Sequence, residues 1–412
     1  MSAWKSIVIV KYNRRQQGFQ ALELEGLKTK LRNEVDTRRQ ELIQLSLRIH
    51  DHPELSFQEK RASSWLIDFL GSNGFRVTAN VASLATAFQA TYGQGSPRIA
   101  LLAEYDALPQ IGHGCGHNII AASAVGAGVA SRLAVDQLGG TIVVLGTPGE
   151  EVFGGKIDMV QAGIFKEIDV AMMVHPNTRD TVSTPMLACT SLDVEFIGEP
   201  AHAAAQPDKG INALEALVLA FSSINSLRQH IKGEARIHGI ITDGGQAPNI
   251  VPAHSAGKFL IRASDGAYLD ELKEKVLNCF RGASLATGAK LEYNWGEKSY
   301  SPMKNNMTLA DLFSENLQSL GRKVEPFDPR FGFGSSDMGN VSQVVPSIHP
   351  TVAIAGPGVI IHTPEFAQAA ASEAGHKGLL DAAKAMAMTV VDILDKRETL
   401  DKIKREFYIR HD

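Results

Sequence analysis

The chain has 412 residues, of which 44% are hydrophobic and 21% charged, a balance typical of a globular protein with more than one domain. Its formal net charge of −4 and sequence pI of about 6.4 indicate no basic surface, so we expect no nucleic-acid partner. The 3 cysteines cannot all pair with one another, which argues against a disulfide framework and favours a reducing compartment.

The N-terminal stretch MSAWKSIVIVKYNRR contains one apolar run, from Ile7 to Val10. A signal peptide needs about 7–15 apolar residues and a membrane span about 20. We therefore expect a cytoplasmic protein with no membrane partner. The stretch itself is interpreted as a short leader with little part in the fold.

The first half of the chain predicts an α/β fold. Apolar residues at helical spacing predict a helix over 23–50, and a second helix over 56–74 opens with Ser56 and Glu59 in the pattern of a capping box. Short apolar runs predict buried strands at 98–103, 141–146, 170–174 and 351–356, with a helix over 119–134 between the first two. Such strands, alternating with helices, predict a mostly parallel sheet with helices on both faces.

The pattern changes at about residue 190. Residues 190–298 predict the order β-α-β-β-α-β, in which the strands alternate between polar and apolar residues, as in a split-βαβ, ferredoxin-like α+β domain. We expect this small domain to be inserted into a larger catalytic domain formed by residues 1–189 and 299–412. The larger domain is expected to end in a helix over 374–396.

Side chains with metal-binding chemistry follow each buried strand. Because the carboxyl ends of parallel strands open on one edge of a sheet, we expect these side chains to converge. Each has an ordinary explanation when taken alone, such as a surface histidine before a proline or a solvated pair of glutamates. Thiolate, imidazole and carboxylate together suit zinc, manganese or cobalt, so their conjunction favours a metal site. The residues are Glu104, Asp106, Cys115, His117, Glu150, Glu151, His175 and His362.

The adjacent glutamates 150 and 151 indicate a hydrolase. Neighbouring side chains diverge, so one of the two can bind metal while the other faces water and transfers its proton to the leaving amine. Asp106 is expected to orient a ligand histidine, with a turn cap in YDALP as an equal alternative. His113 has no preferred role from its spacing and is left unassigned.

Taken together, these motifs resemble the aminoacylase and dimetal carboxypeptidase family of amidohydrolases, in the branch of p-aminobenzoyl-glutamate hydrolase and aminoacylase-1-like dipeptidases. The resemblance spans about residues 40–395. It is carried by HDHPELSFQEKRASSWL, AEYDALPQIGHGCGHN, GTPGEEVFGGK, MVHP, GEPAHAAAQPDKGINALEA, GGQAPNIVP, GSSDMGNVSQVVPSIHP and HTPEF.

The resemblance implies two divalent metal ions per subunit, zinc or manganese, with cobalt and nickel as alternatives. It implies that Glu150 is the general acid/base and that the inserted domain is a lid through which a homodimer forms. In that domain His202 would polarise the scissile carbonyl in the partner subunit's site, and Asn249 would contact substrate. The implied metal ligands are Cys115, His117, Glu151, His175 and His362.

Two departures from the family pattern concern the same loop. Many relatives have a histidine ligand at the end of the first strand, where this chain has Glu104, so Cys115 is expected to replace that ligand. Asn118 stands where many cysteine-containing relatives have aspartate.

The expected substrate is a small N-acyl amino acid, a dipeptide or a p-aminobenzoyl-glutamate-like amide. The main alternative is an N-carbamoyl or related C–N bond on the same scaffold. A non-catalytic metal-binding protein is disfavoured by the intact Glu150, and a cysteine peptidase using Cys115 is a weak fourth hypothesis. Arg262, on a lid strand, has two equal interpretations, a substrate-carboxylate ligand or a surface ion-pair partner.

Overall fold

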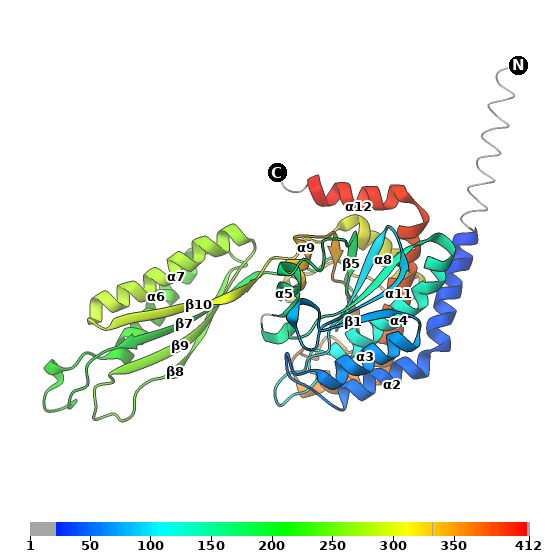
Figure 1. Ribbon diagram of the computed structural model, residues 1–412. Coiled ribbons are helices and arrows are strands. Elements are labelled where there is room, and N and C mark those ends of the chain that lie inside the picture. Colours follow the sequence, from blue (N-terminus) through cyan, green and yellow to red (C-terminus); the bar gives the residue numbers. More distant parts are fainter. Residues whose placement is uncertain (1–21, 153, 332, 410–412) are drawn as a thin grey trace, which may run out of the picture. The chain divides into compact units, whose positions relative to one another are not determined.

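The computed structural model describes residues 22–152, 154–331 and 333–409 (Figure 1). The chain divides into two compact units, of which the second comprises Pro185–Met303 and Pro329–Asn340 and the first the remainder. The insertion expected over 190–298 lies within the second unit. That unit also takes in Pro329–Asn340, where the main-chain N–H of Leu187 donates to Gly334 O at 2.9 Å. The leader expected in the first 15 residues lies outside the described residues.

The first unit opens with helices. A helix covers residues 22–37, a turn follows at Arg38, and α2 spans Arg39–His50, so the helix expected over 23–50 is interrupted there. Helix α3 (Lys60–Ser72) begins at Lys60 instead of near Ser56. The predicted capping box is wrong, because the Ser56 hydroxyl donates to Asp106 and Glu59 makes no side-chain cap bond to α3.

The main sheet of the first unit has six strands in the order β1-β2-β4-β3-β5-β11. The neighbours β4, β3, β5 and β11 run parallel, whereas β1 and β2 pair antiparallel, which confirms the α/β class with an antiparallel edge. The strands are β1 (Arg76–Ala79), β2 (Phe88–Gln94), β3 (Arg98–Ala103), β4 (Gly140–Gly146), β5 (Val170–Met172) and β11 (Ser347–Ile348).

The strand expected over 351–356 does not join this sheet. It forms β12 (Thr351–Ala353), which pairs parallel with β6 (His175–Asn177) in a separate two-stranded sheet. The preceding β11 takes its place beside β5. This small sheet places His175 at its start.

Helix α4 (His117–Leu138) forms the centre of the first unit, packed against strands β2, β3 and β4 and against α11 (Glu373–Asp395). Helix α4 lies very close to strand β4, since a Cβ at Gly128 would lie only 2.6 Å from Val144 Cγ2. Strand β4 is buried along its whole length, so both faces of the sheet are covered. Helix α4 has the length and apolar composition of a membrane span, but 89% of that apolar window is buried inside the fold, as in a core helix.

The chain does not end with the helix expected over 374–396, because α12 (Arg397–Ile409) follows α11. Glu406 of α12 accepts hydrogen bonds from the first main-chain N–H groups of α8 (Met307–Ser319), at Met307 (2.7 Å) and Thr308 (2.8 Å). Short helices are α5 (Gly155–Gln161), α9 (Met338–Ser342) and α10 (Pro364–Ala370), and 3-10 turns lie at Val81–Ser83, Glu150–Val152, Pro207–Lys209, Arg228–His230 and Pro329–Phe331.

The second unit has the predicted order β-α-β-β-α-β and forms an antiparallel sheet in the order β10-β7-β9-β8. Side chains that alternate along β7, such as Leu192, Val194 and Phe196, are buried with the apolar residues of the two helices. The split-βαβ prediction is therefore confirmed. The elements are β7 (Ala188–Ile197), α6 (Ala213–Leu227), β8 (Arg236–Asp243), β9 (His254–Ala263), α7 (Gly266–Thr287) and β10 (Lys290–Tyr300).

Candidate metal centre

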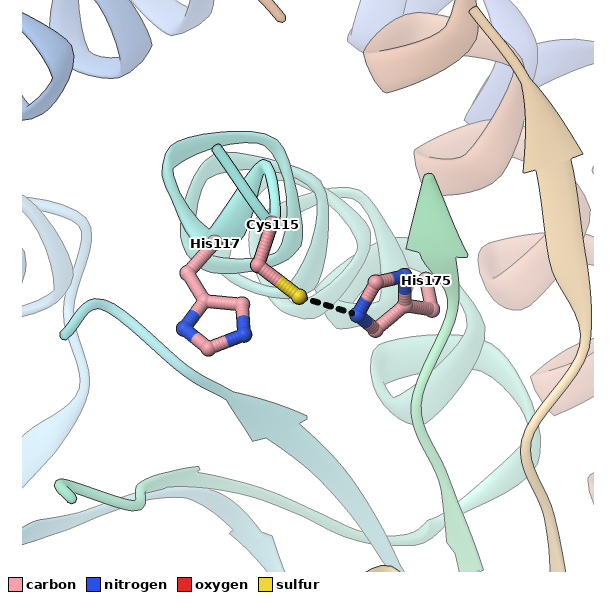
Figure 2. Close-up of side chains that lie close together, drawn as sticks. All are labelled: Cys115, His117 and His175. Carbon is pink, nitrogen blue, oxygen red and sulfur yellow. Dashed lines mark hydrogen bonds between the residues drawn. The ribbon is translucent and has the colours of Figure 1, made fainter. Parts of the chain in front are cut away.

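The stretch GHGCGHN forms the turn that leads into α4. Gly116 has a φ of 79°, and a Cβ at this position would lie 2.5 Å from Cγ of Pro176, so only glycine fits. Cys115 and His117 lie on either side of it, and the ring of His117 lies 5.9 Å from the ring of His175 at the start of β6. Figure 2 shows the Cys115 thiol directed at the His175 ring, with Sγ 3.3 Å from Nε2.

Asp106 determines how the His117 ring is presented. Nδ1 of His117 lies 2.9 Å from both the main-chain oxygen and Oδ1 of Asp106, so Nδ1 donates to Asp106 and Nε2 is the ring nitrogen at which a metal ion would take the place of a proton. This geometry supports the orienting role predicted for Asp106. Burial lowers the pKa of His117, but the neighbouring Cys115 and Asp106 outweigh burial and raise this pKa well above its ordinary value. The surroundings of the ring therefore favour positive charge.

Two buried carboxylate oxygens lie in front of that ring nitrogen. His117 Nε2 lies 3.5 Å from Glu104 Oε2 and 3.9 Å from Glu151 Oε1. None of the three atoms has a hydrogen-bond partner among the described residues. A buried polar group without a partner costs about 1–3 kcal/mol, and an imidazole nitrogen between carboxylate oxygens is a donor set that suits a divalent cation. The residues present therefore fit a metal.

The predicted ligands fall into overlapping groups. In each group the ligand atoms lie within 4.8 Å of one another. His362 Nε2 lies 3.7 Å from Glu151 Oε1, and the main-chain N–H of His362 donates to Gly114 at 2.9 Å, which ties this residue to the cysteine loop. The groups are Cys115–His117–His175, Cys115–Glu151–His362 and His117–Glu150–Glu151.

Burial suppresses charge on two side chains of this cluster. It lowers the pKa of His175 to about 4, helped by the charge of His117, so His175 is neutral and able to coordinate. Burial likewise raises the pKa of the Cys115 thiol. A metal ion bound at the sulfur would supply the positive charge that brings such a thiol to the thiolate form.

Two groups at the cluster were not predicted. Lys156 is fully buried and forms an ion pair with Glu104, which is also fully buried. His349 is buried with its ring 5.5 Å from the ring of His175, and neither of its nitrogens has a partner among the described residues. Both stretches were among the motifs singled out in the sequence, but no local pattern shows that a lysine or a histidine is buried.

Two residues of the cysteine loop lie outside the donor groups. Asn118 is turned away from them, because its Nδ2 donates to Ser46 Oγ (2.9 Å) and to Ala370 O (3.2 Å). Its difference from the family's aspartate therefore leaves the charge of the cluster unaltered. His113 is buried and stacks on His50 with ring centroids 6.1 Å apart.

The remaining candidates belong to the second unit. His202 and Asn249 are exposed and lie on adjacent segments, joined by a hydrogen bond from Ala203 N to Asn249 O at 3.0 Å. Nδ1 of His202 accepts from the main-chain N–H of Ala204 (3.3 Å) and Ala205 (3.2 Å). The proton of the neutral ring is therefore on Nε2. Arg262 donates from Nη1 to Ser335 Oγ at 2.8 Å.

A cluster of cysteine, histidine and carboxylate donors at the carboxyl edge of an α/β sheet is an arrangement suited to a metal-dependent hydrolase. A model of the peptidase family M20/M25/M40 matches residues 100–385, and the chain belongs to this family. It is thus an enzyme that acts on peptide or other C–N bonds, in the branch that the motifs predicted.

Similar proteins span nearly the whole chain. It is 38% identical to the Xaa-Arg dipeptidase of Mus musculus, covering 94% of this chain and 93% of the relative. It is 30% identical to one of the subunits of the p-aminobenzoyl-glutamate hydrolase of Escherichia coli K12, covering 90% of this chain and 93% of that relative.

Solved structures share the fold. An aminohydrolase structure from Staphylococcus aureus superimposes with a TM-score of 0.75 at 20% identity, covering 89% of this chain and 100% of that one. A dinuclear metal-binding M20 peptidase from Bacillus subtilis gives a TM-score of 0.69 at 20% identity, covering 87% and 99%.

Proposed function

We propose that the chain is a dipeptidase that uses two divalent ions, held by Cys115, His117, Glu151, His175 and His362, to cleave a small amide. The observation that carries this proposal is the convergence, beside the other donors, of His117 Nε2 and Glu151 Oε1, which have no hydrogen-bond partner within the described part of the chain. Cys115 and His117 each belong to two of the overlapping groups, which supports a centre of two ions. The cysteine favours zinc, and the carboxylate keeps manganese as the alternative.

Glu150 is the proposed general acid/base. Divalent ions, when bound, supply a water that ionises near neutral pH and a Lewis acid for the scissile carbonyl. Glu150 directly follows Gly149 in the loop after β4 and belongs to one donor group with His117 and Glu151. Its carboxylate takes the proton of the attacking water and then delivers it to the departing amine.

His202 and Asn249 are the proposed substrate contacts. His202 has its Nδ1 occupied by two main-chain N–H groups, so its Nε2–H is available to donate. A donor of this kind stabilises the negative charge that develops on the carbonyl oxygen, and the loss of one such donor lowers kcat by about 100- to 1,000-fold. We expect His202→Ala to have an effect of this size.

A homodimer is proposed through the second unit. Strand β8 is at the edge of its sheet, and its side chains Ile240 and Ile241 are 62% and 44% exposed. On α6, Val218 is 44% exposed. An open edge with apolar side chains is a surface on which another copy can pair. Light scattering should give a dimer mass that Ile240→Lys with Ile241→Lys reduces to a monomer mass.

The first substrate to test is a dipeptide with C-terminal arginine. The 38% identity with an Xaa-Arg dipeptidase supports this choice over p-aminobenzoyl-glutamate, for which the relative is 30% identical. We also propose a cytoplasmic location, supported by three free cysteines.

The test uses the full chain loaded with zinc or manganese in turn and assayed on dipeptides, N-acyl amino acids, p-aminobenzoyl-glutamate and N-carbamoyl amino acids. Glu150→Ala should lose at least about 100-fold in kcat while metal stoichiometry is unchanged. Cys115→Ser should lower the stoichiometry, whereas Cys279→Ser, on helix α7 of the second unit, should not. Near-normal turnover by Glu150→Ala would remove Glu150 from the mechanism.

A further inference from the structure

Two buried carboxylates hold the main chain on either side of Glu150. Glu59 is fully buried, and its Oε1 accepts from the main-chain N–H of Gly149 at 2.9 Å. On the other side, Asp106 Oδ2 accepts from the main-chain N–H of Glu151 at 3.0 Å. The main chain is thus anchored at the residue before and at the residue after the proposed acid/base, each time by a different segment of the chain.

Glu59 also binds Phe57, whose ring packs against this turn. The same Oε1 accepts from the main-chain N–H of Phe57 at 2.7 Å, and Oε2 accepts from the Thr86 hydroxyl at 2.8 Å. Phe57 has a φ of 64°, a conformation that costs a non-glycine residue about 1–3 kcal/mol. A Cβ at Gly149 would lie only 2.6 Å from a ring atom of Phe57, so the ring packs directly against the turn.

The use of Glu59 departs from what its position in the sequence predicts. At the start of α3 it would ordinarily bond to the helix, yet that function falls to Glu54, which accepts from Arg61 N at 2.9 Å and Ala62 N at 3.0 Å. Glu59 instead accepts from three donors, none of which is a predicted metal ligand. A helix cap requires neither the burial of this carboxylate nor these three hydrogen bonds. Departures from local rules of this kind concentrate at functional sites.

We propose that Glu59 is a positioning residue, whose carboxylate holds the Gly149 turn so that Glu150 points at the reacting water. This inference rests on the proposed role of Glu150. Among the described residues Glu59 belongs to none of the donor groups, so its proposed effect is exerted through the turn. Because a displacement of about 1 Å in a catalytic group lowers the rate by up to about 100-fold, Glu59 should act on kcat more than on KM.

The test compares three variants at Glu59 with one at Glu54. Glu59→Ala should lower kcat by about 10- to 100-fold with KM and metal stoichiometry unchanged, and should speed hydrogen exchange in a peptide covering residues 147–152. Glu59→Gln keeps an oxygen for both N–H groups and a donor for Thr86, so it should restore most of kcat. Glu54→Ala removes a helix cap from the same segment and should lower Tm with kcat unchanged.

Glu59→Asp covers the case in which Glu59→Ala does not fold. It keeps the carboxyl group but is one methylene too short to reach both N–H groups, so kcat should fall at least about fivefold with normal metal content. Wild-type kcat in Glu59→Ala or Glu59→Asp, or equal defects in Glu59→Ala and Glu59→Gln, would overturn the inference. If instead Glu150→Ala keeps its turnover, the proposed function fails, while the exchange of peptide 147–152 still reports whether Glu59 holds the turn.

Discussion

Replacing Asp106 with asparagine tests how the metal centre is held together. The Asp106 carboxylate accepts three hydrogen bonds, from His117 Nδ1 (2.9 Å), Glu151 N (3.0 Å) and Ser56 Oγ (2.7 Å). Although burial raises it, the charge and hydrogen bond of His117 bring the pKa of Asp106 below its ordinary value, so the aspartate is ionised. An asparagine has the same shape but only one accepting oxygen.

The size of the effect follows from that difference. If the amide oxygen faces His117, the amide NH₂ meets the N–H of Glu151, and this buried donor loses its partner at a cost of about 1–3 kcal/mol. If the amide is turned round, its NH₂ meets the N–H at Nδ1 of His117, so that N–H keeps only the main-chain oxygen of Asp106 as acceptor and the ring is held less firmly. Loss of such a supporting carboxylate typically weakens metal binding about 10- to 100-fold, or about 1.4–2.8 kcal/mol.

The assay is the dissociation constant of zinc and of manganese, measured by competition with a chelator. Asp136→Asn is the matched control, because Asp136 accepts a hydrogen bond from the Tyr92 hydroxyl (2.8 Å) at an exposed position. We expect Asp106→Asn to bind metal at least about tenfold more weakly and Asp136→Asn to bind as the wild type does. Equal affinities in all three proteins would refute the role assigned to Asp106.

Three further predictions concern stability. Burial raises the pKa of Glu59 from 4.5 to about 7, so its contribution to stability is complete below pH 4.5 and is lost as pH rises through 7. In urea unfolding, the free energy of unfolding of Glu59→Gln should therefore rise relative to the wild type by up to about 3 kcal/mol between pH 5 and 8. A difference that does not vary with pH would contradict this. Asn118→Asp should cost at least about 2 kcal/mol by placing a charge beside a main-chain carbonyl oxygen, yet leave metal stoichiometry unchanged by elemental analysis. Gly128→Ala should lower the free energy of unfolding by about 1–3 kcal/mol, because the added Cβ would meet Val144. Gly26→Ala, in a helix with open space around it, should raise the free energy of unfolding by about 0.5–1 kcal/mol. Thermal unfolding distinguishes the two signs.

The sequence predicted much of the fold because burial leaves a local record in it. The continuous apolar run of β4 and the alternating residues of β7 are visible without any partner segment. The order of elements in the second unit could be predicted for the same reason. The interruption at Arg38 and the extra helix α12 were missed, since both depend on how amphipathic helices pack against the rest of the first unit.

The candidate ligands were predictable because they follow buried strands and turns whose positions the sequence shows. Cys115 and His117 flank a glycine that must adopt a positive φ, and Glu150 and Glu151 directly follow the GTPG turn after β4. The chemistry of these residue types then leaves few alternatives to a metal centre. By itself the sequence thus determined the class of the fold and the types of side chain that meet at the edge of the sheet.

The tertiary structure decided how those side chains are held. Glu59 bonds to Gly149, 90 residues away, and Lys156 pairs with Glu104, 52 residues away. Asn118, one residue beyond a predicted ligand, faces α2 instead of the metal centre. No periodicity or capping rule encodes such contacts, because they depend on where distant segments come together and on which buried polar groups find a partner there.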